Sequence, residues 1–410
     1  MKPLFLAALA LLAAWPQQQN APTFRSGASL IEVDVIVRDR DGAFVDGLTA
    51  DDFELLEDGR AHAIQQFYVV KHAGPAGSAS APDPTAPRKS GRIFVLMFDL
   101  DHLSADGVAR LKQAAETFVD QELGPADVAG IVANGRMAGG RLTSVKSELL
   151  QAIRSLKPAP DSRSARLRPL REFPRIDSEF EAARIADGDT RRLTEATERV
   201  CGQTPVLCQA EGGNAVVMER LEQKARSYID EARASTGTVL RALTALVSGL
   251  ARMPGRKTLV LMTDGFFAEE SLPAVQQIAG QAARNGVAIY GLDGRGLAGS
   301  GTREMPDVTT EGAGLSRSFD TSGTGPEMLA RGTGGFVVRN ASHFAGALGG
   351  IARDTSSYYV LGYAPANSAL DGSFRKIEVK AKGRDGAQVR ARRGYLATPL
   401  PPAVAPRGGG

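Results

Sequence analysis

Two runs of apolar residues along the chain each end in an aspartate. Residues 92–99 read Arg-Ile-Phe-Val-Leu-Met-Phe-Asp, and residues 257–264 read Lys-Thr-Leu-Val-Leu-Met-Thr-Asp. Continuous apolar runs of this length are typical of central strands in a parallel sheet that is covered by helices on both faces. Ligands of such sheets bind beyond the carboxyl ends of the strands. The pattern therefore predicts a polar site at one edge of a sheet, with Asp99 and Asp264 in it.

Strand-like and helix-like patterns alternate through residues 92–354. Apolar residues recur at helical spacing over 105–123 and 239–253, and short β-rich runs occur at 128–133 and 287–292. This alternation is typical of a doubly wound, mostly parallel α/β sheet.

Residues 158–234 interrupt the alternation. They are polar, rich in arginine and longer than a connecting loop without structure of its own, and residues 179–186 and 217–234 have helical spacing. We therefore predict a helical insertion. Its arginines are expected to be solvated, and contact with anionic polymers or an acidic protein is the alternative.

The segments on either side of the α/β region follow a period of two. Apolar and polar residues alternate over 31–37, within residues 24–72, and again within residues 355–398. Neither segment is large enough to make a sandwich alone. We predict that they form one small β-sandwich with the α/β domain inserted between its halves. Residues 73–91 are expected to be a linker and residues 399–410 a disordered tail.

Composition and charge are ordinary for a soluble globular protein. Of the 410 residues 43% are apolar and 23% are charged, and the net charge of +3 does not favour a nucleic-acid partner. Lys2 and the apolar run over residues 4–14 predict a signal peptide over residues 1–19, with a buried helix as the alternative. No later run is apolar and long enough to span a membrane. We expect a periplasmic or secreted protein in which the only cysteines, Cys201 and Cys208, form a disulfide.

Several short motifs resemble a known family. They are Val-Asp-Gly-Leu-Thr-Ala-Asp-Asp-Phe-Glu at 45–54, Pro-Gly-Arg-Lys-Thr at 254–258, Tyr-Tyr-Val-Leu-Gly-Tyr at 358–363 and Arg-Gly-Tyr at 393–395. The chain is similar here to the von Willebrand factor A-related proteins of Acidobacteria, and more broadly to the von Willebrand factor type A domain. The resemblance covers nearly all residues after the signal peptide. It implies the fold of that domain and little about activity.

The broader family also implies a cation site. There, an Asp-x-Ser-x-Ser strand end, a threonine and a second aspartate bind a divalent ion. The resemblance places these groups on Asp99, Thr238 and Asp264, with Asp101 and Leu103 at the two serine positions. Leu103 supplies no oxygen, so the implied site is a degenerate one made by Asp99, Asp101, Thr238 and Asp264, for Mg²⁺, Mn²⁺ or Ca²⁺. The alternative is that these side chains cap neighbouring helices.

These observations favour an exported, non-enzymatic protein-binding or adhesion module. Its unknown protein partner is expected to present an acidic side chain that completes the shell of the cation. One alternative is a metal-free structural or assembly protein of the cell envelope, with the insertion as its contact surface. A hydrolase that uses Ser104 or a metal-bound water is a third hypothesis. His102 and Asp101 are its neighbours in sequence, but adjacency is not triad geometry and no Gly-x-Ser-x-Gly elbow is present.

Overall fold

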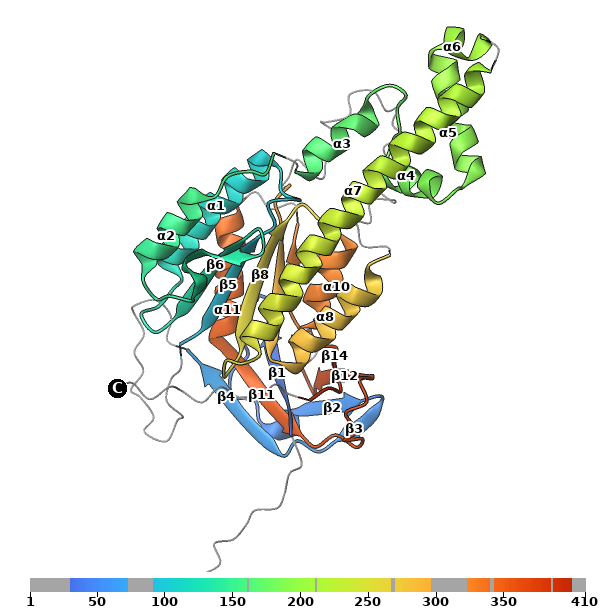
Figure 1. Ribbon diagram of the computed structural model, residues 1–410. Coiled ribbons are helices and arrows are strands. Elements are labelled where there is room, and N and C mark those ends of the chain that lie inside the picture. The colour runs from blue at the N-terminus through green and yellow to red at the C-terminus, as the bar shows by residue number, and fades with distance from the viewer. Residues whose placement is uncertain are drawn as a thin grey trace, which may run out of the picture.

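The computed structural model describes residues 30–72, 91–160, 162–210, 212–266, 270–295, 323–339, 343–384 and 386–399. The predicted signal peptide, and most of the predicted linker and tail, lie outside these residues. The described residues form a mixed α/β structure (Figure 1), in which one six-stranded sheet is mostly parallel and two four-stranded sheets are antiparallel.

The six-stranded sheet has the strand order β10-β9-β8-β5-β6-β7. Neighbouring strands are parallel except for the β6–β7 pair. Every residue of β5, β8 and β9 is buried, as the continuous apolar runs predict. The bounds are β5 Ile93–Phe98, β6 Val128–Ala133, β7 Arg136–Met137, β8 Lys257–Thr263, β9 Val287–Asp293 and β10 Val337–Val338.

Helices cover both faces of this sheet. One face packs against α1 (Ala105–Gln121), α2 (Lys146–Ser155) and α11 (Phe344–Ser356). The other face packs against α8 (Leu272–Arg284), α10 (Thr324–Gly332) and the last turns of α7 (Gly213–Leu250). The doubly wound arrangement predicted from the alternating patterns is therefore present in the described residues.

The two antiparallel sheets combine segments from both ends of the chain. Their strand orders are β13-β1-β11-β4 and β14-β12-β2-β3, and one hydrophobic cluster contains buried residues of both sheets. The β1–β11 and β2–β12 pairs join residues far apart in sequence. The bounds are β1 Ile31–Arg38, β2 Phe53–Glu57, β3 Arg60–His62, β4 Gln66–Lys71, β11 Ser357–Tyr363, β12 Phe374–Ala381, β13 Gln388–Ala391 and β14 Gly394–Leu396. Two short 3-10 helices, η1 and η2, span Ala50–Asp52 and Ala138–Gly140.

A group of helices projects beyond the sheet (Figure 1). We call it the helical arm: α3 (Arg163–Arg171), α4 (Glu179–Ala186), α5 (Thr190–Gln203), α6 (Pro205–Gln209) and the part of α7 up to Ala232. The arm has an apolar core of its own, made by residues such as Leu193, Leu221 and Ile229. The helical insertion is thus present, and it is a separately packed unit.

The last helix of the arm differs from the prediction. The apolar spacing predicted two helices, over residues 217–234 and 239–253, with Thr238 as a possible N-cap of the second. The structure instead has one continuous helix of 38 residues, α7. Packing overrides the local preference, because Thr236 is buried and the Thr238 hydroxyl donates to the Ala234 carbonyl within the helix.

The predicted disulfide is confirmed. Cys201 and Cys208 are joined, with their Cα atoms 5.6 Å apart, at the outer end of the arm. No helix among the described residues combines the length and the apolar character needed to cross a bilayer.

Candidate functional site

Asp99 and Asp264 lie at the same edge of the six-stranded sheet. They directly follow β5 and β8, which are parallel neighbours with Phe98 opposite Met262. The Asp99 amide donates to the Met262 carbonyl at 3.0 Å, so the two chains stay adjacent past the strand ends. Both aspartates are buried, with 5% and 3% of their surface exposed. This part of the sequence prediction describes the geometry correctly.

Both carboxylate oxygens of Asp99 already accept hydrogen bonds. Oδ1 lies 2.9 Å from Nδ1 of His102, and Oδ2 accepts from the Thr263 hydroxyl at 2.8 Å. His102 is 2% exposed. Because an ionised carboxylate only accepts, the ring nitrogen that faces Asp99 carries a proton. The neutral form of His102 then has Nε2 free to accept.

His102 connects the sheet to the helical arm. Its Nε2 lies 3.1 Å from the hydroxyl oxygen of Ser235, and in the neutral form of His102 the Ser235 hydroxyl donates to it. The same oxygen accepts from the Arg166 guanidinium at 3.1 Å. We call the series Thr263, Asp99, His102, Ser235 and Arg166 the strand-end chain. It joins β8, the loop after β5, α7 and α3 through consecutive hydrogen bonds.

The loop after β5 makes further contacts with the base of the arm. The Asp101 carbonyl accepts from the backbone amide of Arg163 at 2.8 Å and from the Arg166 guanidinium at 3.1 Å. Ser235 itself lies between the last arm-core residue of α7, Ala232, and the first residue of α7 that packs on the sheet, Val239. The strand-end chain therefore lies at the junction between the arm and the sheet.

Asp264 is held by the start of α1. Its Oδ2 accepts from the backbone amide of Ser104 at 2.8 Å. Its Oδ1 is buried and has no hydrogen-bond partner among the described residues, and burial raises the pKa of this carboxyl group. A Cβ placed on Gly294 would lie 2.7 Å from Oδ1, and one on Gly107 would lie 3.2 Å from it. Oδ1 therefore faces closely packed backbone.

The other predicted ligands do not join these two aspartates. Asp101 is half-buried, and the described contacts use its carbonyl group. Thr238 is exposed on α7, where its hydroxyl donates to Ala234 and accepts from Arg241 at 3.1 Å. Leu103 is fully buried in the apolar core beside α1.

The described residues do not fit a divalent cation at this edge. No group of three or more His, Cys, Asp or Glu side chains suited to a metal ion occurs in the described part of the chain. Both oxygens of Asp99 are taken by protein donors, and the position of Leu103 supplies no oxygen. The strand-end polar groups instead hydrogen-bond the arm to the sheet.

His102 is close to Ser104 in sequence, but in the structure it contacts Ser235. The Ser104 side chain caps α1, where its oxygen accepts from the Gly107 amide at 3.1 Å. Ser235 is 133 positions away from His102 in sequence, so no local pattern indicates the contact. The one local signal is the spacing of Asp99 and His102, which brings a carboxylate and an imidazole together in one turn.

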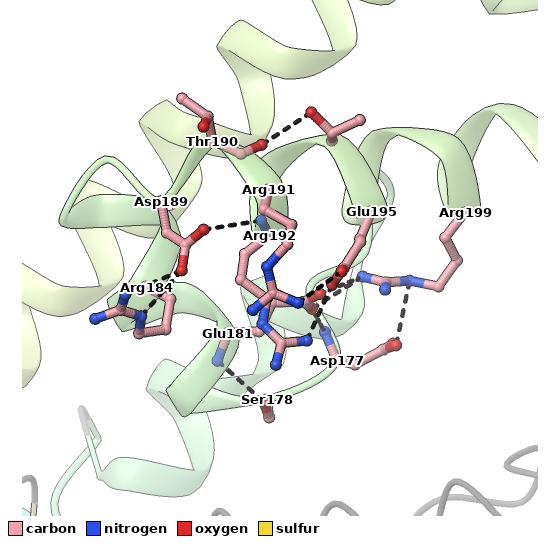
Figure 2. A network of polar contacts seen from close by, with 11 residues as sticks. Asp177, Ser178, Glu181, Arg184, Asp189, Thr190, Arg191, Arg192, Glu195 and Arg199 are labelled. Atoms are coloured by element: carbon pink, nitrogen blue, oxygen red, sulfur yellow. Dashed lines mark hydrogen bonds and ion pairs between the residues drawn. The ribbon is translucent and has the colours of Figure 1, made fainter.

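The arginines of the arm are largely paired with carboxylates. Figure 2 shows Arg199 between Asp177 and Glu181, at 3.2 and 2.9 Å, and Arg184 beside Asp189 at 3.0 Å. Of the basic run before α4, Arg163 pairs with Glu179, and Arg175 pairs with Asp177. Paired arginines on a solvated surface do not favour binding of an anionic polymer.

The outer end of the arm carries exposed apolar side chains. Val206 is 77% exposed, Leu207 is 41% exposed and Val216 is 49% exposed. The first two belong to α6, beside the disulfide, and Val216 lies in the first turn of α7, which packs against α6. We call these three residues the arm tip. A group of exposed apolar residues at the end of a projecting element is typical of a protein-binding surface.

No family model matches the chain, and no curated protein matches it.

Proposed function

We propose that the protein is an exported, non-enzymatic binding module of the von Willebrand factor A type that binds a partner protein through its helical arm and without a metal ion. The strand-end chain is the observation that carries this proposal. At the edge where the cation would bind, Asp99 is occupied by His102 and Thr263, and the series continues to the arm. In this proposal Asp99 does not bind a cation that receives an acidic partner. Through His102 and Ser235 it holds the helical arm in position.

The arm tip is the contact surface in this proposal. When a partner covers apolar side chains that are exposed on a small projecting element, the burial of their surface lowers the free energy of the complex. The disulfide between Cys201 and Cys208 closes the chain beside Val206 and Leu207, which limits the freedom that the tip would lose on binding. It also fits an oxidising compartment outside the cytoplasm. We expect the partner surface to be apolar as well, because the arm tip consists of apolar side chains. In this proposal no acidic side chain of the partner binds a cation.

The arm tip is tested by replacing Val206 and Leu207 with serine. Immobilised wild-type protein is expected to retain specific envelope proteins from an extract, and the double variant is expected to lose them, because the apolar contact area is gone. Retention by the wild type is expected to be the same with and without EDTA. Retained proteins are identified by mass spectrometry after cross-linking and confirmed with the purified partner.

Leu370→Ser is the matched control, because Leu370 is an exposed apolar residue (54%) outside the arm. It is expected to retain the same proteins as the wild type. Retention that the tip substitutions leave unchanged, or that EDTA abolishes, would contradict the proposal.

A serine hydrolase is the second candidate, and one specific observation favours it. Asp99, His102 and Ser235 have the connectivity of a catalytic triad, with 2.9 Å between Asp99 and Nδ1 and 3.1 Å between Nε2 and the hydroxyl oxygen. In that reaction Ser235 would attack an acyl carbon while His102 takes its proton. The burial of His102 and the Arg166 bond to the Ser235 oxygen favour a structural role.

Reaction with a fluorophosphonate probe distinguishes the two roles. We expect no more labelling of the wild type than of Ser235→Ala, because the Ser235 oxygen is held in the junction of the arm. A matched substitution, Ser227→Ala, changes an exposed serine of the same helix. Stoichiometric labelling of the wild type and of Ser227→Ala, lost in Ser235→Ala, would replace the binding proposal with a hydrolase.

A further inference from the structure

We propose that a second site, a cavity between the six-stranded sheet and the antiparallel sheets, binds a small organic anion that carries a carboxylate or phosphate group on an apolar body. The cavity has a volume of about 660 Å³. It lies at the amino end of β8, whereas Asp264 follows the carboxyl end of the same strand. The site is therefore distinct from the strand-end chain and from the arm tip, and the inference does not depend on the proposed function.

Several elements meet around this cavity. The start of β8 contributes Arg256 and Lys257, and β1 contributes Glu32 and Asp34. Tyr358 and Val360 line it from β11. The loop between α7 and β8, the turn after α8, and Arg390 and Arg392 provide most of the remaining wall. A cavity of this volume is large enough for a small ligand.

Cations outnumber anions in the lining. The basic lining residues are Arg252, Arg256, Lys257, Arg284, Arg390 and Arg392, and the acidic ones are Glu32 and Asp34. Asp34 lies 3.3 Å from Arg256, and Arg390 pairs with Asp354. The four other cations, Arg252, Lys257, Arg284 and Arg392, have no carboxylate within 4 Å among the described residues. The lining thus has an excess of positive charge that the described part of the protein does not neutralise.

Lys257 is the most confined of these cations. It is 3% exposed, and its ammonium group donates one hydrogen bond, to the Met253 carbonyl at 3.0 Å. Burial lowers the pKa of Lys257 to about 8. A buried ammonium group without a carboxylate partner is costly to maintain, and an anionic ligand beside it would remove that cost.

Unused donors accompany the unpaired charge. The Nε atoms of Arg256, Arg390 and Arg392 are buried and have no acceptor among the described residues. Buried donors in folded proteins nearly always find an acceptor. Carboxylate and phosphate oxygens are the acceptors that guanidinium groups bind best. The excess positive charge of the lining therefore indicates an anionic ligand.

The apolar part of the wall determines the rest of the ligand. Tyr358 and Val360 are buried in β11 and line the cavity, and the Arg256 guanidinium lies over the Tyr358 ring at 5.0 Å from its centre. Met253 and Tyr68 add further apolar surface. An aromatic or aliphatic body can pack on this wall while its anionic group faces Lys257.

The titratable groups around Lys257 set the expected pH dependence. Glu32 and Asp34 line the cavity from β1, Tyr68 from β4 and Tyr358 from β11, and the other cations are permanently charged arginines. Burial raises the pKa of Tyr68 to about 12, and that of Tyr358 is also raised, so neither ionises near pH 8. Lys257 is the cation whose charge changes there. Anion binding is therefore expected to weaken as the pH rises from 7 to 9.

Isothermal titration calorimetry on the full chain tests the site with benzoate, phenyl phosphate and the uncharged analogue benzamide. We expect both anions to bind at pH 7 and benzamide not to bind. Benzoate affinity is expected to fall about tenfold by pH 9 in the wild type. Lys257→Met is expected to bind benzoate at least tenfold more weakly at pH 7, with no change between pH 7 and pH 9.

Lys224→Met is the matched control. Lys224 is also partly buried and also donates to backbone carbonyls, those of Glu172 and Pro174, but it lies in the helical arm. It is expected to bind benzoate like the wild type. If Lys257→Met fails to fold by circular dichroism, Arg284→Met replaces it. Among the described residues, Arg284 donates only to the Thr398 carbonyl and has no carboxylate partner.

Three results would overturn the inference. The wild type binding neither anion would show that the cavity is not an anion site. Equal binding of benzamide would show that charge is not recognised. Unchanged benzoate affinity in a folded Lys257→Met or Arg284→Met variant would show that binding occurs elsewhere.

Discussion

Asp99→Ala is expected to lower the free energy of unfolding by about 3 kcal/mol, because it leaves two buried donors without an acceptor. These are the Nδ1 proton of His102 and the hydroxyl of Thr263, both in residues that are 2% exposed. Urea denaturation followed by circular dichroism measures the change. Limited proteolysis is expected to cleave faster at the base of the arm, where His102 would no longer hold Ser235 in place.

Asp101→Ala is the control for this substitution. Asp101 belongs to the same loop and to the same predicted ligand set, but its described contacts are made by the backbone carbonyl. We expect a change below about 0.5 kcal/mol, as for most surface substitutions. A large effect of Asp101→Ala, together with a wild-type melting temperature that rises with Mg²⁺, would favour the cation site over the strand-end chain.

Leu221→Ala is expected to destabilise the helical arm by about 3 kcal/mol while leaving the six-stranded sheet intact. Leu221 is fully buried in the arm core, which shares no buried residue with the two cores of the sheet. Local opening of a separately packed unit exposes its own amides first. Hydrogen exchange followed by mass spectrometry should therefore show faster exchange in α4 and α5 and unchanged exchange in β5 and β8.

Gln223→Ala is the matched control in the same helix, because Gln223 is exposed and alanine favours the helix. Its exchange is expected to match that of the wild type throughout. If Leu221→Ala accelerates exchange in β5 and β8 as much as in α4, the arm and the sheet unfold as one unit. Binding through the arm tip would then depend on the stability of the whole protein.

The strands β1 and β5 could be predicted from the sequence, because the order of apolar and polar residues shows which of their faces are buried. An uninterrupted apolar run such as residues 92–99 must be buried on both faces, and β5 occupies nearly all of it. Residues 31–37 alternate because one side of β1 faces the apolar core between the two antiparallel sheets. In both strands, whether a residue is apolar or polar depends on whether its own side chain is buried or exposed.

The strand-end chain was not predictable, because it depends on where a distant helix docks. The sequence predicted a helix that begins after Thr238, whereas packing makes this residue part of the continuous helix α7. The resemblance had placed Thr238 in the implied ligand set at a position just ahead of that predicted helix. The partner of His102 is Ser235, which the continuous helix α7 brings to it. No motif near His102 in the sequence indicates this contact.

The unbroken course of α7 has a mechanical consequence. At 1.5 Å per residue its 38 residues form a stiff rod of about 57 Å. A load applied beside Val216 is carried along this rod past Ser235 to the turns from Val239 onward, which pack on the six-stranded sheet. The helix therefore couples the outer end of the arm directly to the core of the sheet.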